Sequence, residues 1–165
     1  MNSGLGKCCN FISFDDCIGS GETVEKYLFR SEYNSKADAF SDLYAKRQAR
    51  LYIVVYHSDA RGVQRIEQHP AARGAVFVQT LSPPDTTHKV FSDDSRIIPD
   101  KTRRAAFKAF CETMGDQLFP GSPLGWGDCQ WCVAYDYSIP DTSLPVLFAA
   151  TSSPIVWIPL FPRNR

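Results

Sequence analysis

Residues 51–56 are LYIVVY, an uninterrupted apolar run that is rich in β-branched and aromatic side chains. This composition is typical of a central strand that is buried on both faces of a sheet. The preceding segment, residues 35–48, carries apolar side chains at helical spacing, and Ser35 and Asp38 are placed as a capping pair. We therefore expect a helix over residues 35–48 that is followed directly by a central strand.

The residues after this strand predict a meander. Residues 58–62, SDARG, are typical of a turn, and residues 63–68 then predict a second, more polar strand. Another turn at residues 70–74 leads into AVFVQTL at residues 75–81, which predicts a third strand. Because only short turns separate them, these three strands are expected to pair antiparallel.

The second half of the chain predicts one long helix and more strands. Asp100 is a natural helix cap, and the apolar residues of the predicted helix recur at i, i+3, i+4, i+7 and i+11, namely Phe107, Phe110, Cys111, Met114 and Leu118. Three more strands are expected at residues 130–137, 146–150 and 155–160. The whole pattern predicts an α+β fold with a mostly antiparallel sheet of about five to seven strands and two main helices packed on one side.

The chain length predicts a single globular domain over residues 1–165. Residues 1–10 and 161–165 are expected to be poorly ordered, because chain ends fray unless they are tied down. Residues 82–101 are rich in proline, serine and aspartate and predict a long loop.

Charge and hydropathy narrow the function classes. Eighteen basic and eighteen acidic residues give a net charge of zero, which argues against a nucleic-acid partner. No run is apolar and long enough for a membrane span or an export signal, so a soluble cytoplasmic protein without membrane contact is expected. A net charge near zero also favours association, and a homo-oligomer is one expectation.

The segment GWGDCQWC at residues 125–132 is a candidate site, because it contains two tryptophans, two cysteines and an acid. A cysteine nucleophile needs a base and a group that orients the base, so one hypothesis is a small hydrolase or transferase with Cys129 as the nucleophile. His57 or His69 would be its base, and Asp128 or Asp136 would orient that base.

Zinc binding is a further hypothesis for the same segment. Cys129 and Cys132 form one C-x-x-C pair, but the only other paired thiols are the adjacent Cys8 and Cys9, whose side chains diverge. We therefore expect no metal site and no cofactor.

The favoured hypothesis is a recognition module that binds a protein partner or a small ligand, of the inhibitor, immunity or adaptor type. Aromatic side chains dominate such binding surfaces when they are partly exposed. The candidate binding residues lie within residues 125–132 or just after them and are Trp126, Trp131, Tyr135 and Tyr137.

The sequence does not predict a phosphate site. The glycines at residues 19–21 lack the spacing of a Walker loop or of a dinucleotide fingerprint, and are expected to be turn residues. The acid pairs at residues 15–16 and 93–94 are expected to be solvated loop acids.

Overall fold

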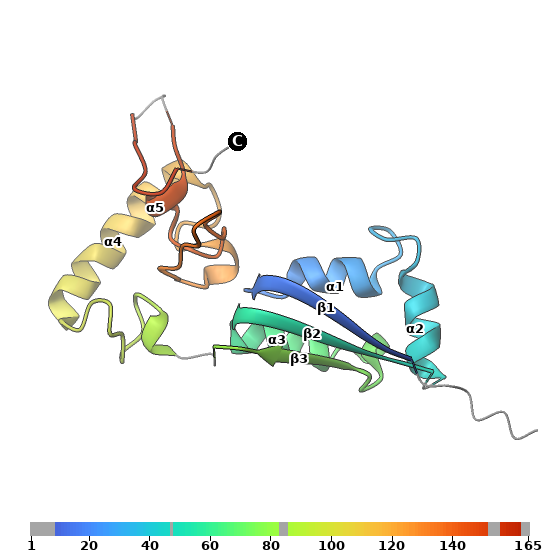
Figure 1. The fold of residues 1–165 in the computed structure, drawn as a ribbon. Coiled ribbons are helices and arrows are strands. Elements are labelled where there is room, and N and C mark those ends of the chain that lie inside the picture. The colour runs from blue at the N-terminus through green and yellow to red at the C-terminus, as the bar shows by residue number, and fades with distance from the viewer. Residues whose placement is uncertain (1–8, 47, 83–85, 152–155, 163–165) are drawn as a thin grey trace, which may run out of the picture. The chain divides into compact units, whose positions relative to one another are not determined.

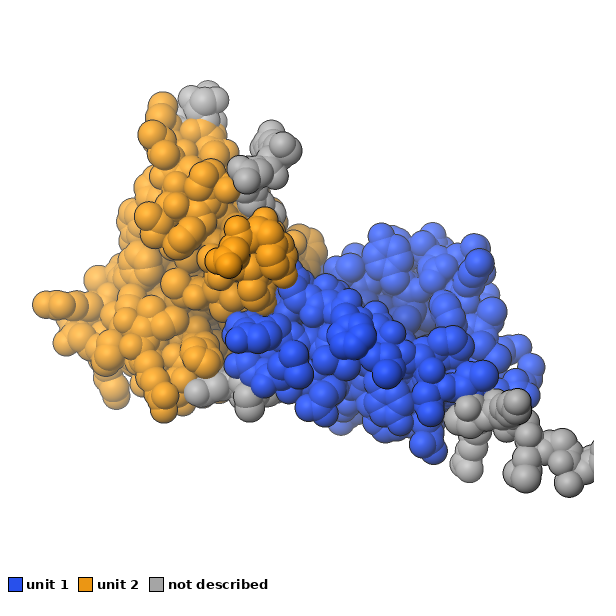
Figure 2. All heavy atoms as spheres, viewed as in Figure 1, with its two compact units in different colours: residues 1–84 blue, residues 85–165 orange. Residues whose placement is uncertain are grey.

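The computed structural model describes residues 9–46, 48–82, 86–151 and 156–162. The chain divides into two compact units, residues 1–84 and residues 85–165, which are coloured separately in Figure 2. Each unit has its own hydrophobic core. The expectation of a single globular domain stays a prediction, and residues 1–8 and 163–165 of the predicted frayed ends lie outside the described residues.

Unit 1 is built on a three-stranded sheet in the order β1-β2-β3 (Figure 1). The strands are β1 (Cys9–Ile18), β2 (Ala49–Ser58) and β3 (Val76–Thr80), and both pairings are parallel. The expected antiparallel sheet of five to seven strands is therefore wrong, because the described residues form three strands in one all-parallel sheet. The prediction of a central strand at residues 51–56 is confirmed as β2.

Helices connect these parallel strands. Between β1 and β2 lie α1 (Glu22–Phe29) and α2 (Ala37–Ala45), and α3 (Ala60–Glu67) with the 3-10 turn η1 (Pro70–Ala72) leads from β2 to β3. The helix predicted over residues 35–48 is confirmed as α2, whereas the strand predicted at residues 63–68 is wrong and belongs to α3. A helix in that place carries the chain back across the sheet, so the next strand runs parallel to the last.

The helices cover one face of the sheet. Along β2 the residues at 49, 51, 53 and 55 are buried, and those between them are exposed or half-buried. The buried row packs with Leu28 of α1, Tyr44 of α2 and Ile66 of α3. The expectation that this strand is buried on both faces is wrong, because its other face, with Tyr56, is left open.

Unit 2 is organised by α4 (Lys101–Leu118), which confirms the long helix predicted after Asp100. The rest of the described unit contains the short helical turns η2 (Thr86–His88), η3 (Trp126–Asp128) and α5 (Pro145–Phe148). The strands predicted at residues 130–137 and 146–150 are wrong: Trp131 makes isolated bridges only, and α5 occupies the second segment. The strand predicted at residues 155–160 is likewise reduced to one bridge at Trp157, with Ile155 outside the described residues.

The core of unit 2 lies against the apolar face of α4. Cys111 is fully buried there with Val90 and Leu144. Arg104 of the same helix is 6% exposed, and its guanidinium donates to the carbonyl oxygens of Asp93 and Ile98 at 3.2 and 3.1 Å. The loop before α4 is therefore attached to the helix by hydrogen bonds from a buried arginine.

Candidate functional site

The carboxyl ends of all three strands meet at one edge of the sheet in unit 1. The backbone N–H of Asp59, just past β2, donates to the carbonyl of Ile18 at the end of β1 at 2.8 Å. The hydroxyl groups of Ser58 and Thr80 lie 2.6 Å apart and join the ends of β2 and β3. In open parallel sheets, ligands bind outside this edge.

A glycine-bearing loop, residues 19–21, joins the end of β1 to the start of α1. Gly21 has φ +74°, which is a left-handed conformation that glycine adopts without steric cost. It stands at the N-cap of α1 and brings no side chain to the first turn. The Ser20 hydroxyl accepts a hydrogen bond from the backbone N–H of Glu22 at 3.4 Å. The helix thus begins with backbone N–H groups and a positive dipole end, which is a favourable environment for an anion.

Helix α3 packs directly on this loop through Gly62. A Cβ atom at this position would lie 2.0 Å from the carbonyl oxygen of Gly19, and one at Gly21 would lie 2.7 Å from the carbonyl oxygen of Gly62. Neither glycine can carry a side chain without moving backbone. The two glycines therefore let the loop and the helix approach one another closely.

Two adjacent acids precede the loop in β1. Asp15 and Asp16 each accept a hydrogen bond from the backbone N–H of the following residue at 2.8 Å. Burial raises the pKa of Asp15, and the neighbouring carboxylate of Asp16 adds to the shift. The interpretation of residues 15–16 as loop acids is wrong, because both lie in a strand just before the loop.

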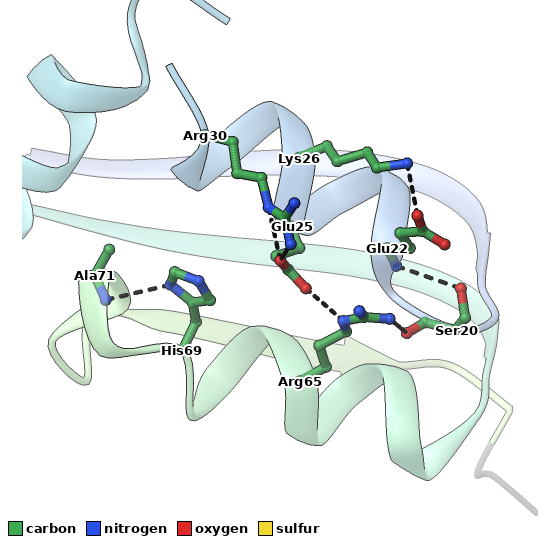
Figure 3. Close-up of polar contacts among 8 residues, drawn as sticks. All are labelled: Ser20, Glu22, Glu25, Lys26, Arg30, Arg65, His69 and Ala71. Carbon is green, nitrogen blue, oxygen red and sulfur yellow. Dashed lines mark hydrogen bonds and ion pairs between the residues drawn. The ribbon is translucent and has the colours of Figure 1, made fainter. Parts of the chain in front are cut away.

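An ion-pair network links α1, α3 and the loop, as Figure 3 shows. The carboxylate of Glu25 is 7% exposed and receives Arg30 on one oxygen and Arg65 on the other. Arg65 also donates to the carbonyl of Ser20 at 3.3 Å. Burial acts to raise the pKa of Glu25, but the hydrogen bonds from Arg30 and Arg65 outweigh it, so that the pKa lies below its ordinary value.

The two histidines named as candidate bases both lie in unit 1. His57 is the penultimate residue of strand β2, with its ring 4.8 Å from that of Tyr56 in an edge-on arrangement. His69 caps η1: its Nδ1 accepts from the N–H of Ala71 at 3.2 Å, and its ring stacks on Phe29 at 4.2 Å. Two neighbours therefore fix the ring of His69, and Figure 3 shows its hydrogen bond with Ala71.

The candidate nucleophile and its orienting acids lie in unit 2. Cys129 is fully buried, and Asp128 beside it has φ +54° in η3 and accepts from the Gln130 side chain at 3.1 Å. Asp136 is exposed. The thiol therefore belongs to one unit and its two candidate bases, His57 and His69, to the other, and the cysteine hypothesis stays a prediction.

The candidate binding aromatics differ in exposure. Trp131 is 5% exposed and belongs to the interior of unit 2, whereas Trp126 is 39% exposed and lies edge-on against Phe119. Tyr135 and Tyr137 stack on each other at 5.6 Å, and both line a hollow with residues 160–162. Their role as a binding surface stays a prediction.

Among the described residues, no three histidine, cysteine or acidic side chains are grouped closely enough to hold a metal ion. Cys8, one of the candidate zinc ligands, lies outside the described residues. In the part of the chain that the structure describes, no helix has the length and apolar character to cross a membrane.

The loop at residues 19–21 was not predicted as a site. The sequence does carry a signal: two acids follow an apolar alternation, Cys17 and Ile18 separate them from GSG, and a segment with Val24 and Leu28 one helical turn apart comes next. A glycine-rich turn between a strand and a helix is an arrangement that brings backbone N–H groups to an anion. Its spacing matches neither a Walker loop nor a dinucleotide fingerprint, so the sequence alone favoured a turn.

No curated protein and no solved structure matches the chain. A family model described as PRTase-CE matches residues 2–163. Because the match extends over both units and nearly the full sequence, the chain belongs to the PRTase-CE family.

Proposed function

We propose that the chain is a phosphoribosyltransferase and that unit 1 binds the phosphoribosyl donor at the carboxyl edge of its sheet. The name of the family supports this, since PRTase abbreviates that activity. Family membership points to a transferase and not to a binding protein, which corrects the expected recognition module of the inhibitor, immunity or adaptor type.

The observation that carries the proposal is that two acids near the end of β1, the loop at residues 19–21 and the N-terminus of α1 follow one another closely in the chain. A phosphoribosyl group presents a phosphate and neighbouring ribose hydroxyl groups. The loop at residues 19–21 and the N-terminus of α1 offer backbone N–H groups and a positive dipole end to the phosphate. Asp15 and Asp16 offer carboxylate oxygens, which accept hydrogen bonds from hydroxyl groups.

In the transfer itself, the bond between C1 of the ribose and its leaving group breaks, and a bond from C1 to the acceptor forms. A leaving diphosphate would carry the departing electron pair, and the acceptor would lose a proton. The chain contributes most by binding and orienting the donor, because correct placement of two reactants can account for a large part of a rate enhancement.

The test is calorimetric titration of the chain with 5-phosphoribosyl 1-diphosphate, with ribose 5-phosphate as a competitor. The double variant D15N/D16N keeps the size of both side chains but removes two negative charges. We expect it to bind the donor about tenfold more weakly or worse, as for a lost charged hydrogen bond.

The matched control is Asp38→Asn, which removes one charge from an exposed acid of α2 in the same unit. It should bind like the unaltered chain. Absence of saturable donor binding by the unaltered chain at millimolar concentration would contradict the proposed function.

A further inference from the structure

Arg65 of α3 hydrogen-bonds both to the loop at residues 19–21 and to α1. Its Nη1 donates to the carbonyl oxygen of Ser20 at 3.3 Å, and its Nε donates to Oε2 of Glu25 (Figure 3). Arginine suits this role because its planar guanidinium presents several donors in fixed directions.

Glu25 in turn holds Arg65 in place. It is buried, and its two oxygens are divided between two arginines, Oε1 for Arg30 and Oε2 for Arg65. If Arg65 swung away, a buried carboxylate would lose one of its two partners, which is costly. Glu25 therefore fixes the guanidinium through Nε, while Nη1 binds the carbonyl oxygen of Ser20 in the loop.

The contact with Ser20 fixes the direction of a backbone N–H. In a planar trans peptide the C=O and the following N–H point in opposite directions. With the carbonyl of Ser20 directed to Arg65, the N–H of Gly21 is directed away from Arg65. The left-handed φ of Gly21 then leads directly into the first turn of α1.

The same helix supports the loop a second time, through the close approach of Gly62 to Gly19 and Gly21. Gly62 and Arg65 are three residues apart, so they lie on one side of α3. Packing by the glycine and hydrogen bonding by the arginine thus act on the same three loop residues.

We infer that Arg65 is a positioning residue, which keeps the loop at residues 19–21 in the conformation that binds the donor phosphate. This rests on the proposed function of unit 1. Arg65 acts on the donor through the backbone of the loop, so α3 influences donor affinity without contacting the donor itself.

The experiment compares Arg65→Gln with Arg30→Gln in the full chain. Both variants remove one arginine from Glu25, but only Arg65 donates to the loop. Donor affinity is measured by titration with 5-phosphoribosyl 1-diphosphate, well below the melting temperature of each variant. We expect Arg65→Gln to weaken binding about tenfold, and Arg30→Gln to change it by less than about threefold.

Hydrogen exchange of the loop gives a readout that does not need the donor. Exchange at the amides of Gly21 and Glu22 should rise in Arg65→Gln and stay near the unaltered rate in Arg30→Gln. If Arg65→Gln does not fold, Arg65→Lys takes its place. A single ammonium group cannot reproduce both contacts of the guanidinium, so the donor affinity of Arg65→Lys should lie between those of the unaltered chain and of Arg65→Gln.

Equal donor affinity and equal loop exchange in Arg65→Gln and the unaltered chain would overturn the inference, as would an equal loss in both arginine variants. If the unaltered chain does not bind the donor, the proposed function fails. The exchange rates then decide separately whether Arg65 orders the loop.

Discussion

Glu25 combines burial with two cationic partners, and this makes its charge a source of stability. Its pKa is lower in the folded chain than in the unfolded chain, so the unfolded state takes up the proton first on acidification. The stabilisation is therefore complete at neutral pH. It begins to be lost as the pH falls below about 4, where glutamate ordinarily titrates, and the loss continues as the pH falls through the lowered pKa of the folded chain.

Glu25→Gln should lower the free energy of unfolding at pH 7 by about 2 kcal/mol, the value typical of hydrogen bonds to a charged group. The difference from the unaltered chain should shrink in acid, because both chains then lack the carboxylate charge. Denaturant unfolding between pH 7 and pH 3 measures it. Glu32→Gln, an exposed acid after α1, is the control. A pH-independent difference would mean that packing, not charge, is responsible.

Cysteine reactivity should follow burial. Burial raises the pKa of Cys111 to about 12, and Cys129 is equally inaccessible. Only about one Cys111 thiol in ten thousand would be ionised at pH 8, and the thiolate is the reactive form. In the folded chain, iodoacetamide should modify the exposed Cys9 and leave these two thiols intact, as peptide mass spectrometry would show. Rapid native modification of Cys129 would instead support the cysteine nucleophile hypothesis.

At the scale of elements, α4 depends on its first turn. The side chain of Asp100 accepts a hydrogen bond from the N–H of Arg103 at 2.7 Å. Asp100→Ala should therefore reduce stability by about 1 kcal/mol, with faster amide exchange at the start of α4. Asp100→Asn retains the capping oxygen and should behave like the unaltered chain. Equal destabilisation by both substitutions would assign the effect to charge near the helix dipole instead.

The sequence predicted the elements whose pattern is long or continuous. Both α2 and α4 repeat an apolar face over several turns, and the apolar run of β2 is continuous, so these three elements were found. Helix α3 has only eight residues and contains Gly62, a poor helix former, so its short segment was interpreted as a strand. That one error changed the predicted direction of the neighbouring strands from parallel to antiparallel, because a strand in place of a connecting helix turns a parallel pair into a meander.

The site was missed for a related reason. Asp15 and Asp16 are neighbours in sequence, and their place at the carboxyl edge depends on β1 pairing with a strand 40 residues later. Nothing local indicates that pairing. The ion pair between Glu25 and Arg65 likewise joins residues 40 positions apart, and no sequence spacing predicts it.

For the whole molecule, the two cores share no residue. One contains Val55 and Ile66, and the other contains Val90 and Cys111. Each core also has a glycine that its fold requires: a Cβ at Gly115 in α4 would lie 2.2 Å from the carbonyl oxygen of Pro123. Gly62 is the counterpart in unit 1. A substitution at Gly62 should therefore strain unit 1, and a substitution at Gly115 should strain unit 2.

Gly62→Ala and Gly115→Ala should each destabilise by about 1–3 kcal/mol, as for overpacking, less the helical preference of alanine. Hydrogen exchange with mass spectrometry should show lost protection in the strands of unit 1 for the first variant, and in α4 for the second. Gln64→Ala, at a site exposed on α3, is the control. If either glycine variant loosened both units equally, the chain would unfold as the single cooperative domain that its length predicts. Loosening confined to one unit would mean that a donor bound to unit 1 protects that unit alone, because a ligand stabilises only what unfolds together with its site.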